Sequence, residues 1–167
     1  MKTLYFIGGP MGVGKTAACR ALRDRLPRSV FLDGDWCWDM HPFQVTAETK
    51  ALVMDNIVHC LRNFLSCSAF DHVIFAWVMH RQAILDELLV RLAPPDSVRI
   101  IAVSLVCSPE ALEKRISKDV TAGLRLPDVL PRALDYLPLY AALNTVKLDT
   151  SALTAAEVAA RLATFRF

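Results

Sequence analysis

Residues 9–16 read GPMGVGKT, which matches the G-x-x-x-x-G-K-[ST] pattern of a phosphate-binding loop. Glycines allow such a loop to turn its backbone N–H groups inward toward a polyphosphate. The lysine brings a positive charge to the β- and γ-phosphates, and the hydroxyl of the last residue can ligate Mg²⁺. The motif therefore predicts that a nucleotide is bound by Gly9, Gly12, Val13, Gly14, Lys15, Thr16 and Ala17.

The sequence on both sides of the loop fits this interpretation. The apolar run TLYFI at residues 3–7 is typical of a buried strand. A helical pattern begins at Lys15 and runs to Leu26, where Pro27 ends it. A phosphate group would thus meet the N-terminus of a helix, whose dipole favours anions.

The composition is that of a compact α/β protein. The chain has 167 residues, the length of one domain, and 54% of them are hydrophobic. No apolar run reaches the roughly 18 residues of a membrane-spanning helix, so we expect no membrane partner. The net charge is +2 and the basic residues are scattered, which argues against a nucleic-acid partner.

The five cysteines point to a reducing compartment. Their number is odd and none forms a C-x-x-C pair, so neither a disulfide framework nor a zinc site is indicated. Cys19, Cys60 and Cys67 lie in helical patterns and are expected to be small core residues. The first strand starts close to Met1, so we expect no signal peptide and a cytoplasmic location.

Strand and helix patterns alternate along the rest of the chain. Further strands are predicted at residues 29–33, 72–78, 98–106 and 146–148, and helices at 47–66, 81–92, 109–120, 132–143 and 154–165. Five strands alternating with helices predict an α/β fold, a P-loop NTPase with a five-stranded parallel sheet flanked by helices. We expect a single domain over residues 1–167, with a short helical lid at about 115–139.

An acidic turn, Asp33-Gly34-Asp35, follows the second predicted strand. Ligands of open parallel sheets bind beyond the carboxyl ends of the strands, where these carboxylates should lie. One carboxylate there could accept the proton of an attacking hydroxyl or orient a Mg²⁺-bound water. The alternative is a solvated D-G turn. Asp35 is the favoured base and Asp33 a helper, and Thr16 and Asp35 are the predicted metal ligands.

At this point the chain resembles the small P-loop kinases of the nucleotide-kinase-like group. Residues 32–35 (LDGD) look like the acidic turn of adenylylsulfate and gluconate kinases, and residues 107–115 (CSPEALEKR) are similar to the helix that enters their lid. The chain also looks related to bacterial AAA-like ATPases and to antibiotic-resistance P-loop phosphotransferases. The resemblance implies that Arg115 clamps phosphate from the lid, with Arg125 as a second candidate.

The sequence departs from nucleoside monophosphate kinases in two places. Residues 77–81 (WVMHR), after the third strand, carry no carboxylate, which argues against an ordinary nucleoside monophosphate acceptor. The predicted lid is short and has no cysteine quartet for zinc. A compact helical lid is therefore expected.

The segment 36–43 (WCWDMHPF) directly follows the predicted base. Trp36 and Trp38 could form an aromatic acceptor pocket, or they could anchor the loop to the core. Asp39 could bind acceptor hydroxyls or cap a turn. His80 and Arg81, at the end of the third strand, could bind an anionic acceptor or clamp the phosphoryl group, although both residue types are more often found on the surface.

These features predict an ATP- and Mg²⁺-dependent phosphotransferase that acts on a hydroxyl or phosphate of a small molecule. Lys15, Asp35, Asp33 and Arg115 are the predicted catalytic residues, and Arg125 is a predicted substrate-binding residue. Lys118 and Arg132 are further cations of the lid. The alternatives are an ATP-binding regulatory protein and a simple NTPase. Nucleosides, nucleotides, sugars and antibiotic-like alcohols all fit an aromatic pocket, and the oligomeric state is left open.

Overall fold

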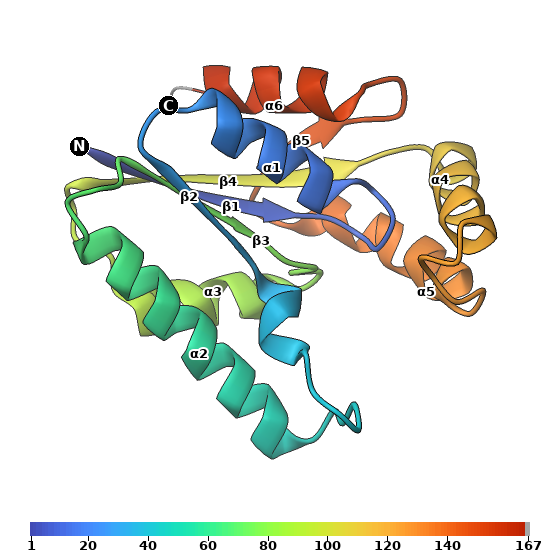
Figure 1. The fold of residues 1–167 in the computed structure, drawn as a ribbon, viewed down its shortest axis with the longest axis horizontal. Coiled ribbons are helices and arrows are strands. Elements are labelled where there is room, and N and C mark those ends of the chain that lie inside the picture. Colours follow the sequence, from blue (N-terminus) through green and yellow to red (C-terminus); the bar gives the residue numbers. More distant parts are fainter. Residues whose placement is uncertain (166–167) are drawn as a thin grey trace.

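Five parallel strands form one sheet in the computed structural model, which describes residues 1–165 (Figure 1). The strand order is β2-β3-β1-β4-β5. The strands are β1 (Lys2–Gly8), β2 (Ser29–Asp33), β3 (His72–Ala76), β4 (Val98–Val106) and β5 (Val146–Asp149). The expected parallel α/β sheet is therefore confirmed.

Helices cover both faces of the sheet. The α-helices are α1 (Lys15–Arg25), α2 (Ala47–Ser66), α3 (Gln82–Leu92), α4 (Pro109–Thr121), α5 (Val129–Tyr136) and α6 (Ala155–Thr164), and two 3₁₀ helices are η1 (Gly34–Trp38) and η2 (Leu137–Ala142). Figure 1 shows α1 and α6 on one face and α2 and α3 on the other, with α4 and α5 beyond the carboxyl ends of the strands.

The two faces of the sheet build two separate hydrophobic clusters. Alternate residues of β1 divide between them: Tyr5 and Ile7 belong to the cluster under α1 and α6, and Leu4 and Phe6 to the cluster under α2 and α3. All four side chains are buried. A strand covered on both faces needs apolar residues without alternation, which explains the continuous apolar runs in the sequence.

Two predicted elements differ from the structure. The predicted helix over 132–143 is α5 (Val129–Tyr136) followed by the 3₁₀ helix η2, because Pro138 has no backbone N–H to continue an α-helix. The predicted strand over 72–78 ends at Ala76. Beyond it, the Val78 carbonyl accepts hydrogen bonds from the Gly9 N–H and the Tyr140 hydroxyl instead of continuing the sheet.

The cysteine prediction holds only in part. Cys19 of α1 is fully buried. Cys60 and Cys67 are only half-buried, because Cys67 follows the last residue of α2 and Cys60 lies at the margin of the α2 cluster. All five cysteines are free thiols.

Strand register brings three chain segments to one edge of the sheet. Ala76 of β3 is paired with Ile7 of β1 on one side and with Asp33 of β2 on the other. The residues that follow these three positions therefore leave neighbouring strands at the same level. They are the phosphate-loop segment, the acidic turn and the segment that begins at Trp77.

The phosphate loop packs against α4, which lies beyond the carboxyl ends of the strands. Gly12 has a φ of 79°, a left-handed conformation that disfavours side chains. A Cβ atom at this position would overlap Cγ1 of Ile116 on α4, which is itself fully buried. Gly12 is therefore required both by its backbone conformation and by the close approach of α4.

Gly12→Ala should lower the free energy of unfolding by about 2–5 kcal/mol, because a left-handed alanine costs ~1–2 kcal/mol and overpacking costs ~1–3 kcal/mol. Gly14→Ala is the matched control, since Gly14 has a φ of 101° but no atom within 4 Å of the added Cβ. In Gly14→Ala, the free energy of unfolding should fall only by the cost of the left-handed alanine. Urea unfolding of both variants measures the difference, and equal losses would exclude the Ile116 contact as its cause.

Candidate active site

A cavity of about 390 Å³ lies over the phosphate loop. Its lining residues come from the loop, the start of α1, the acidic turn and α4: Met11, Gly12, Gly14, Lys15, Thr16, Ala17, Asp35, Arg115, Lys118, Asp119 and Arg125. Most of the predicted phosphate-binding residues therefore share one cavity with the acidic turn. Gly9 and Val13 are not among its lining residues, and Val13 is buried.

The N-terminus of α1 is open to a ligand, because no described side chain occupies it. No described side chain caps this helix, and its first turn contains no acidic residue. The first N–H groups of a helix have no intrahelical partners, and the dipole leaves this end partly positive. The residues Gly14–Thr16 therefore offer free donors to an anion, as a phosphate site requires.

The Lys15 ammonium is held inside its own loop. Nζ donates to the carbonyl oxygens of Gly9 at 2.7 Å and Pro10 at 2.9 Å. Burial lowers the pKa of Lys15 to about 8, although the charges of Asp35 and Asp33 act in the opposite direction. A nucleotide phosphate would add negative charge here and favour the protonated form.

Asp33 connects the phosphate loop to the acidic turn. Its side chain is 5% exposed, and Oδ2 accepts a hydrogen bond of 2.6 Å from the Thr16 hydroxyl. Its other oxygen, Oδ1, accepts from the Asp35 backbone N–H at 3.1 Å and caps the 3₁₀ helix η1. The sequence assigned Asp33 a helper role, and these contacts orient both Thr16 and Asp35.

Asp35 is an exposed residue that lines the cleft, where neighbouring groups partly desolvate its carboxylate. Desolvation and the charge of Asp33 raise the pKa of this carboxyl group, whereas Lys15, Arg125 and a hydrogen bond from the Trp77 side chain lower it. A carboxylate whose pKa is raised is a better proton acceptor than an ordinary one. Asp35 thus has the environment of a general base.

Gly34 lets Trp77 reach the acidic turn. A Cβ atom on Gly34 would lie 2.6 Å from Cγ and 2.7 Å from Cδ1 of the Trp77 indole. The ring therefore rests on the backbone of the turn, which explains why a glycine separates the two aspartates. Sequence reasoning missed this role because Trp77 was interpreted as the end of an apolar strand, and the segment 77–81 was considered only for its lack of a carboxylate. Its position at the carboxyl end of a strand was the available signal.

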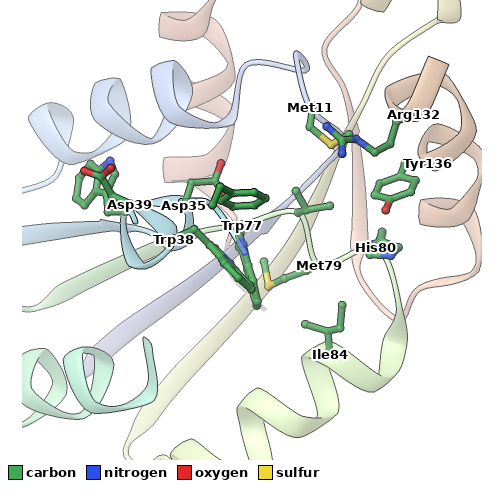
Figure 2. Close-up of a pocket in the computed structure, with 13 residues that line it drawn as sticks. Met11, Asp35, Trp38, Asp39, Trp77, Met79, His80, Ile84, Arg132 and Tyr136 are labelled. Carbon is green, nitrogen blue, oxygen red and sulfur yellow. The ribbon is translucent and has the colours of Figure 1, made fainter. Parts of the chain in front are cut away.

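A second cavity of about 680 Å³ adjoins the first (Figure 2). Aromatic and apolar side chains make up most of its lining, which consists of Met11, Asp35, Trp36, Trp38, Asp39, Phe43, Trp77, Val78, Met79, His80, Ile84, Arg132 and Tyr136. The structure thus brings together Trp36, Trp38, Asp39 and His80, as the sequence suggested. Tyr136 and Met79 were not expected there.

One wall of the second cavity is a pair of stacked rings. The His80 and Tyr136 rings lie 4.2 Å apart, with 16° between their planes. Burial and the charge of Arg81 lower the pKa of His80, so its imidazole is neutral at neutral pH. The neighbouring Met79 is buried in a left-handed conformation with a φ of 40°. The Tyr140 hydroxyl, which donates to the Val78 carbonyl, holds this turn.

The two predicted lid arginines occupy different places. Arg115 donates to the Val13 carbonyl and to the Thr150 hydroxyl, each at 3.1 Å, and so links the phosphate loop to the turn after β5. Arg125 forms an ion pair with Asp119 at 2.9 Å, and its charge acts on the pKa values of Lys15 and Asp35. Both line the phosphate cavity, but Arg125 is the one whose charge acts on the acidic turn.

Arg81 stands apart from the other predicted residues. Its side chain is exposed at the start of α3 and lines neither cavity. Arg132 of α5, which the sequence placed only among the lid cations, does line the aromatic cavity. The positions of Arg81 and Arg132 both depend on how the helices pack beyond the edge of the sheet.

The residues at the phosphate loop suit a magnesium ion that also binds phosphate. No cluster of three or more His, Cys, Asp or Glu side chains within residues 1–165 could hold a metal. Mg²⁺, however, usually keeps several waters and takes only one or two protein oxygens beside substrate phosphates. Thr16 and the two aspartates offer such oxygens, and the Thr16–Asp33 hydrogen bond of 2.6 Å keeps two of them together.

Comparisons with known proteins agree with this architecture. A family model described as an AAA domain matches residues 6–123. This span contains the phosphate loop, the acidic turn and the start of the predicted lid. No curated protein sequence matches significantly. The P-loop family expected from the motif is thereby confirmed.

Several solved structures share the fold. The tunicamycin resistance protein of Deinococcus radiodurans has a TM-score of 0.70 and 19% identity, over 98% of this chain and 94% of that one. A gluconokinase from Sinorhizobium meliloti 1021 has a TM-score of 0.65 and 20% identity, over 96% and 93%. A shikimate kinase from Acinetobacter baumannii, solved with shikimate, has a TM-score of 0.60 and 23% identity, over 98% and 91%. At these identities the similarity establishes the fold.

The helices of this chain are too short or too polar to span a bilayer, as far as residues 1–165 are concerned.

Nucleotide affinity should depend on pH through Lys15. Below a pH of about 8 the ammonium is charged, and above it the free protein loses this charge, because burial has lowered the pKa from 10.5. The phosphates of ADP bind the charged form. The Kd for ADP should therefore be constant between pH 7 and pH 7.5 and rise by up to about tenfold per unit above pH 8.

Isothermal titration calorimetry between pH 7 and pH 9.5 measures this dependence. Lys15→Ala is the control, because it should bind ADP more weakly at every pH and without the rise. A Kd that stays flat in the unmodified protein would show that Lys15 keeps its charge throughout this range.

Proposed function

The chain belongs to the AAA domain family, and we propose that it transfers the γ-phosphoryl group of ATP to a hydroxyl group of a small molecule. The observation that carries this proposal is the position of Asp35. This carboxylate lines both the phosphate cavity and the aromatic cavity, together with Met11. A base at the junction of a donor site and an acceptor site is what phosphoryl transfer needs. The kinases among the structural neighbours are consistent with this activity.

The phosphate loop would bind and orient ATP. The free N–H groups at the start of α1 receive the phosphates, and Lys15 leaves the carbonyls of Gly9 and Pro10 to contact the β- and γ-phosphates. In the transition state, negative charge is spread over the oxygens of the transferred phosphoryl group. These donors stabilise that charge and need form no covalent bond to do so.

Asp35 would accept the proton of the acceptor hydroxyl. As the hydroxyl oxygen bonds to the γ-phosphorus, the bond from that phosphorus to the β–γ bridging oxygen breaks. The proton passes to Asp35, and ADP leaves with the electron pair of the broken bond. The Trp77 side chain and the Asp35–Asp33 backbone contact hold the carboxylate in place for this step.

Thr16 and Asp35 would hold Mg²⁺, with Asp33 bound to Thr16 behind them. When bound, the ion would neutralise phosphate charge during the transfer. Asp33 orients the Thr16 hydroxyl for this purpose. Its own burial and two hydrogen bonds keep it from moving toward the substrate.

Arg125 and Arg115 would serve the same transfer from the lid. Arg125 is released from Asp119 when phosphate is present and turns toward the transferred group, to which its planar fork is suited. Arg115 ties the phosphate loop to the turn after β5, so it supports the loop from the side away from the acceptor. Closure of the lid segment 115–139 excludes water, which would otherwise compete with the acceptor.

We also propose a cytoplasmic location and no nucleic-acid partner, which the odd number of cysteines and the scattered basic residues support. An ATP-binding regulatory protein and a simple NTPase are the two rivals. Neither rival accounts for a second, aromatic cavity that opens beside the base. An increase in ATP consumption when an acceptor is added would distinguish phosphoryl transfer from both the regulatory protein and the NTPase.

Asp35→Asn should keep its affinity for ADP within about threefold and lose at least about 100-fold in acceptor-stimulated ADP release, because general-base catalysis contributes about 10²–10⁴-fold. Asp96→Asn is the matched control, since Asp96 is exposed before β4 and outside both cavities. ADP release is measured with Mg²⁺ against a panel of nucleosides, nucleotides, sugars and aromatic alcohols.

Two results would contradict the proposed transfer. Turnover by Asp35→Asn equal to that of the control would assign the base to another residue. ATP binding with turnover that no acceptor in the panel increases would favour the regulatory protein or the NTPase.

A further inference from the structure

We propose that the acceptor is an alcohol carried on an uncharged planar ring, which lies among the aromatic side chains of the larger cavity. This inference rests on the proposed phosphoryl transfer and specifies its substrate class. Three observations carry it: the location of the tryptophans, the exposure of aromatic rings, and the charges around the cavity.

All three tryptophans of the chain line this one cavity. Trp36 and Trp38 come from η1 and Trp77 from the segment after β3, so two different strand ends supply them. Figure 2 shows Trp38 and Trp77 beside Asp35, with Met79 next to them. Trp77 is accounted for by its contact with Gly34 and Asp35, but neither Trp36 nor Trp38 touches the base in this way.

Part of the aromatic surface is left open to solvent. Trp36 is 51% exposed and Phe43 is 66% exposed, although both line the cavity. Large aromatic residues that only anchor a loop are normally covered. Trp38 and Phe43 form a tilted ring pair with centroids 5.9 Å apart. The stacked rings of His80 and Tyr136 form a further aromatic wall of the cavity. Together these surfaces offer flat faces to a ring.

The charges around the cavity oppose an anionic acceptor. Among the described residues that line it, Asp35 and Asp39 are acidic and Arg132 is the one arginine or lysine. His80 adds no charge, because burial and Arg81 lower its pKa. A nucleotide or a sugar acid would bring its negative charge toward two carboxylates and the triphosphate of ATP. Binding such a ligand normally requires several arginines or lysines.

Arg132 is placed for the phosphoryl group and not for the far end of the cavity. It forms no salt bridge or side-chain hydrogen bond with any described residue. In Figure 2 its side chain extends toward Met11, which belongs to the phosphate loop and lines both cavities. The portion formed by Trp38, Met79 and Ile84 is therefore mostly apolar, and of these three side chains only the Trp38 indole N–H can donate a hydrogen bond. A polyol would leave most of its hydroxyl groups there without partners.

Three matched probes separate charge from ring shape. They are 2-phenylethanol, its anionic analogue 4-(2-hydroxyethyl)benzoate, and the non-planar 2-cyclohexylethanol, with sorbitol as a polyol. Tryptophan fluorescence of the full chain reports binding, because every tryptophan lies in this cavity. The Kd of 2-phenylethanol should be at least tenfold lower than that of the benzoate and at least threefold lower than that of 2-cyclohexylethanol, and sorbitol should leave the fluorescence unchanged.

Phe43→Ser tests the ring contact without disturbing the core, since Phe43 is largely exposed. The Kd of 2-phenylethanol should rise by about three- to tenfold in this variant. Val90→Ser removes an exposed apolar side chain of α3 outside the cavity and should bind like the unmodified protein. Equal Kd values for Phe43→Ser and Val90→Ser would overturn the role of the exposed ring.

ADP release with the same probes distinguishes the substrate class from the transfer itself. Stronger binding or stimulation by the benzoate, by sorbitol or by the cyclohexyl compound would overturn the inferred class while leaving a kinase in place. Binding of 2-phenylethanol that depends on Phe43, without ADP release for any panel compound, would keep the ring site and refute phosphoryl transfer. Absence of binding by all four probes would overturn the ring site.

Discussion

The carboxylate of Asp33 is the contact on which the rest of the site depends. It lies buried at the end of β2, and its two oxygens bind the Thr16 hydroxyl of the phosphate loop and the backbone N–H of Asp35. Strand register makes this possible, because Asp33, Ala76 and Ile7 share one row of the sheet. A single carboxylate thereby sets the spacing between the phosphate loop and Asp35.

The second constraint is the contact of Trp77 with Gly34. The indole occupies the space that a side chain on the acidic turn would need, and it also lowers the pKa of Asp35. The same ring forms part of the aromatic cavity. The proposed base, Asp35, therefore lies against a residue of the cavity that would receive the acceptor, so a change in that cavity also alters the surroundings of Asp35. This arrangement links recognition of the acceptor to the position of the carboxylate.

Local patterns were enough to predict most of the fold. The phosphate loop, the order of strands and helices and the acidic turn all depend on conformations and periodicities of neighbouring residues. The helix predicted over 132–143 was wrong in its extent, because Pro138 stops an α-helix and the chain continues as a 3₁₀ helix. Cys60 and Cys67 were placed too deep, since helical periodicity alone does not show where a helix leaves the core.

The sequence by itself determined the phosphate-loop motif and its place next to two aspartates at the end of a parallel sheet. The motif residues are contiguous, so their geometry follows from local backbone conformation. Only the tertiary structure decided which distant residues join them. It brought Tyr136 and Arg132 of α5 to the aromatic cavity, left Arg81 outside, and gave Arg125 rather than Arg115 the electrostatic contact with Asp35. These positions depend on strand register and on helix packing beyond the sheet, which no local pattern encodes.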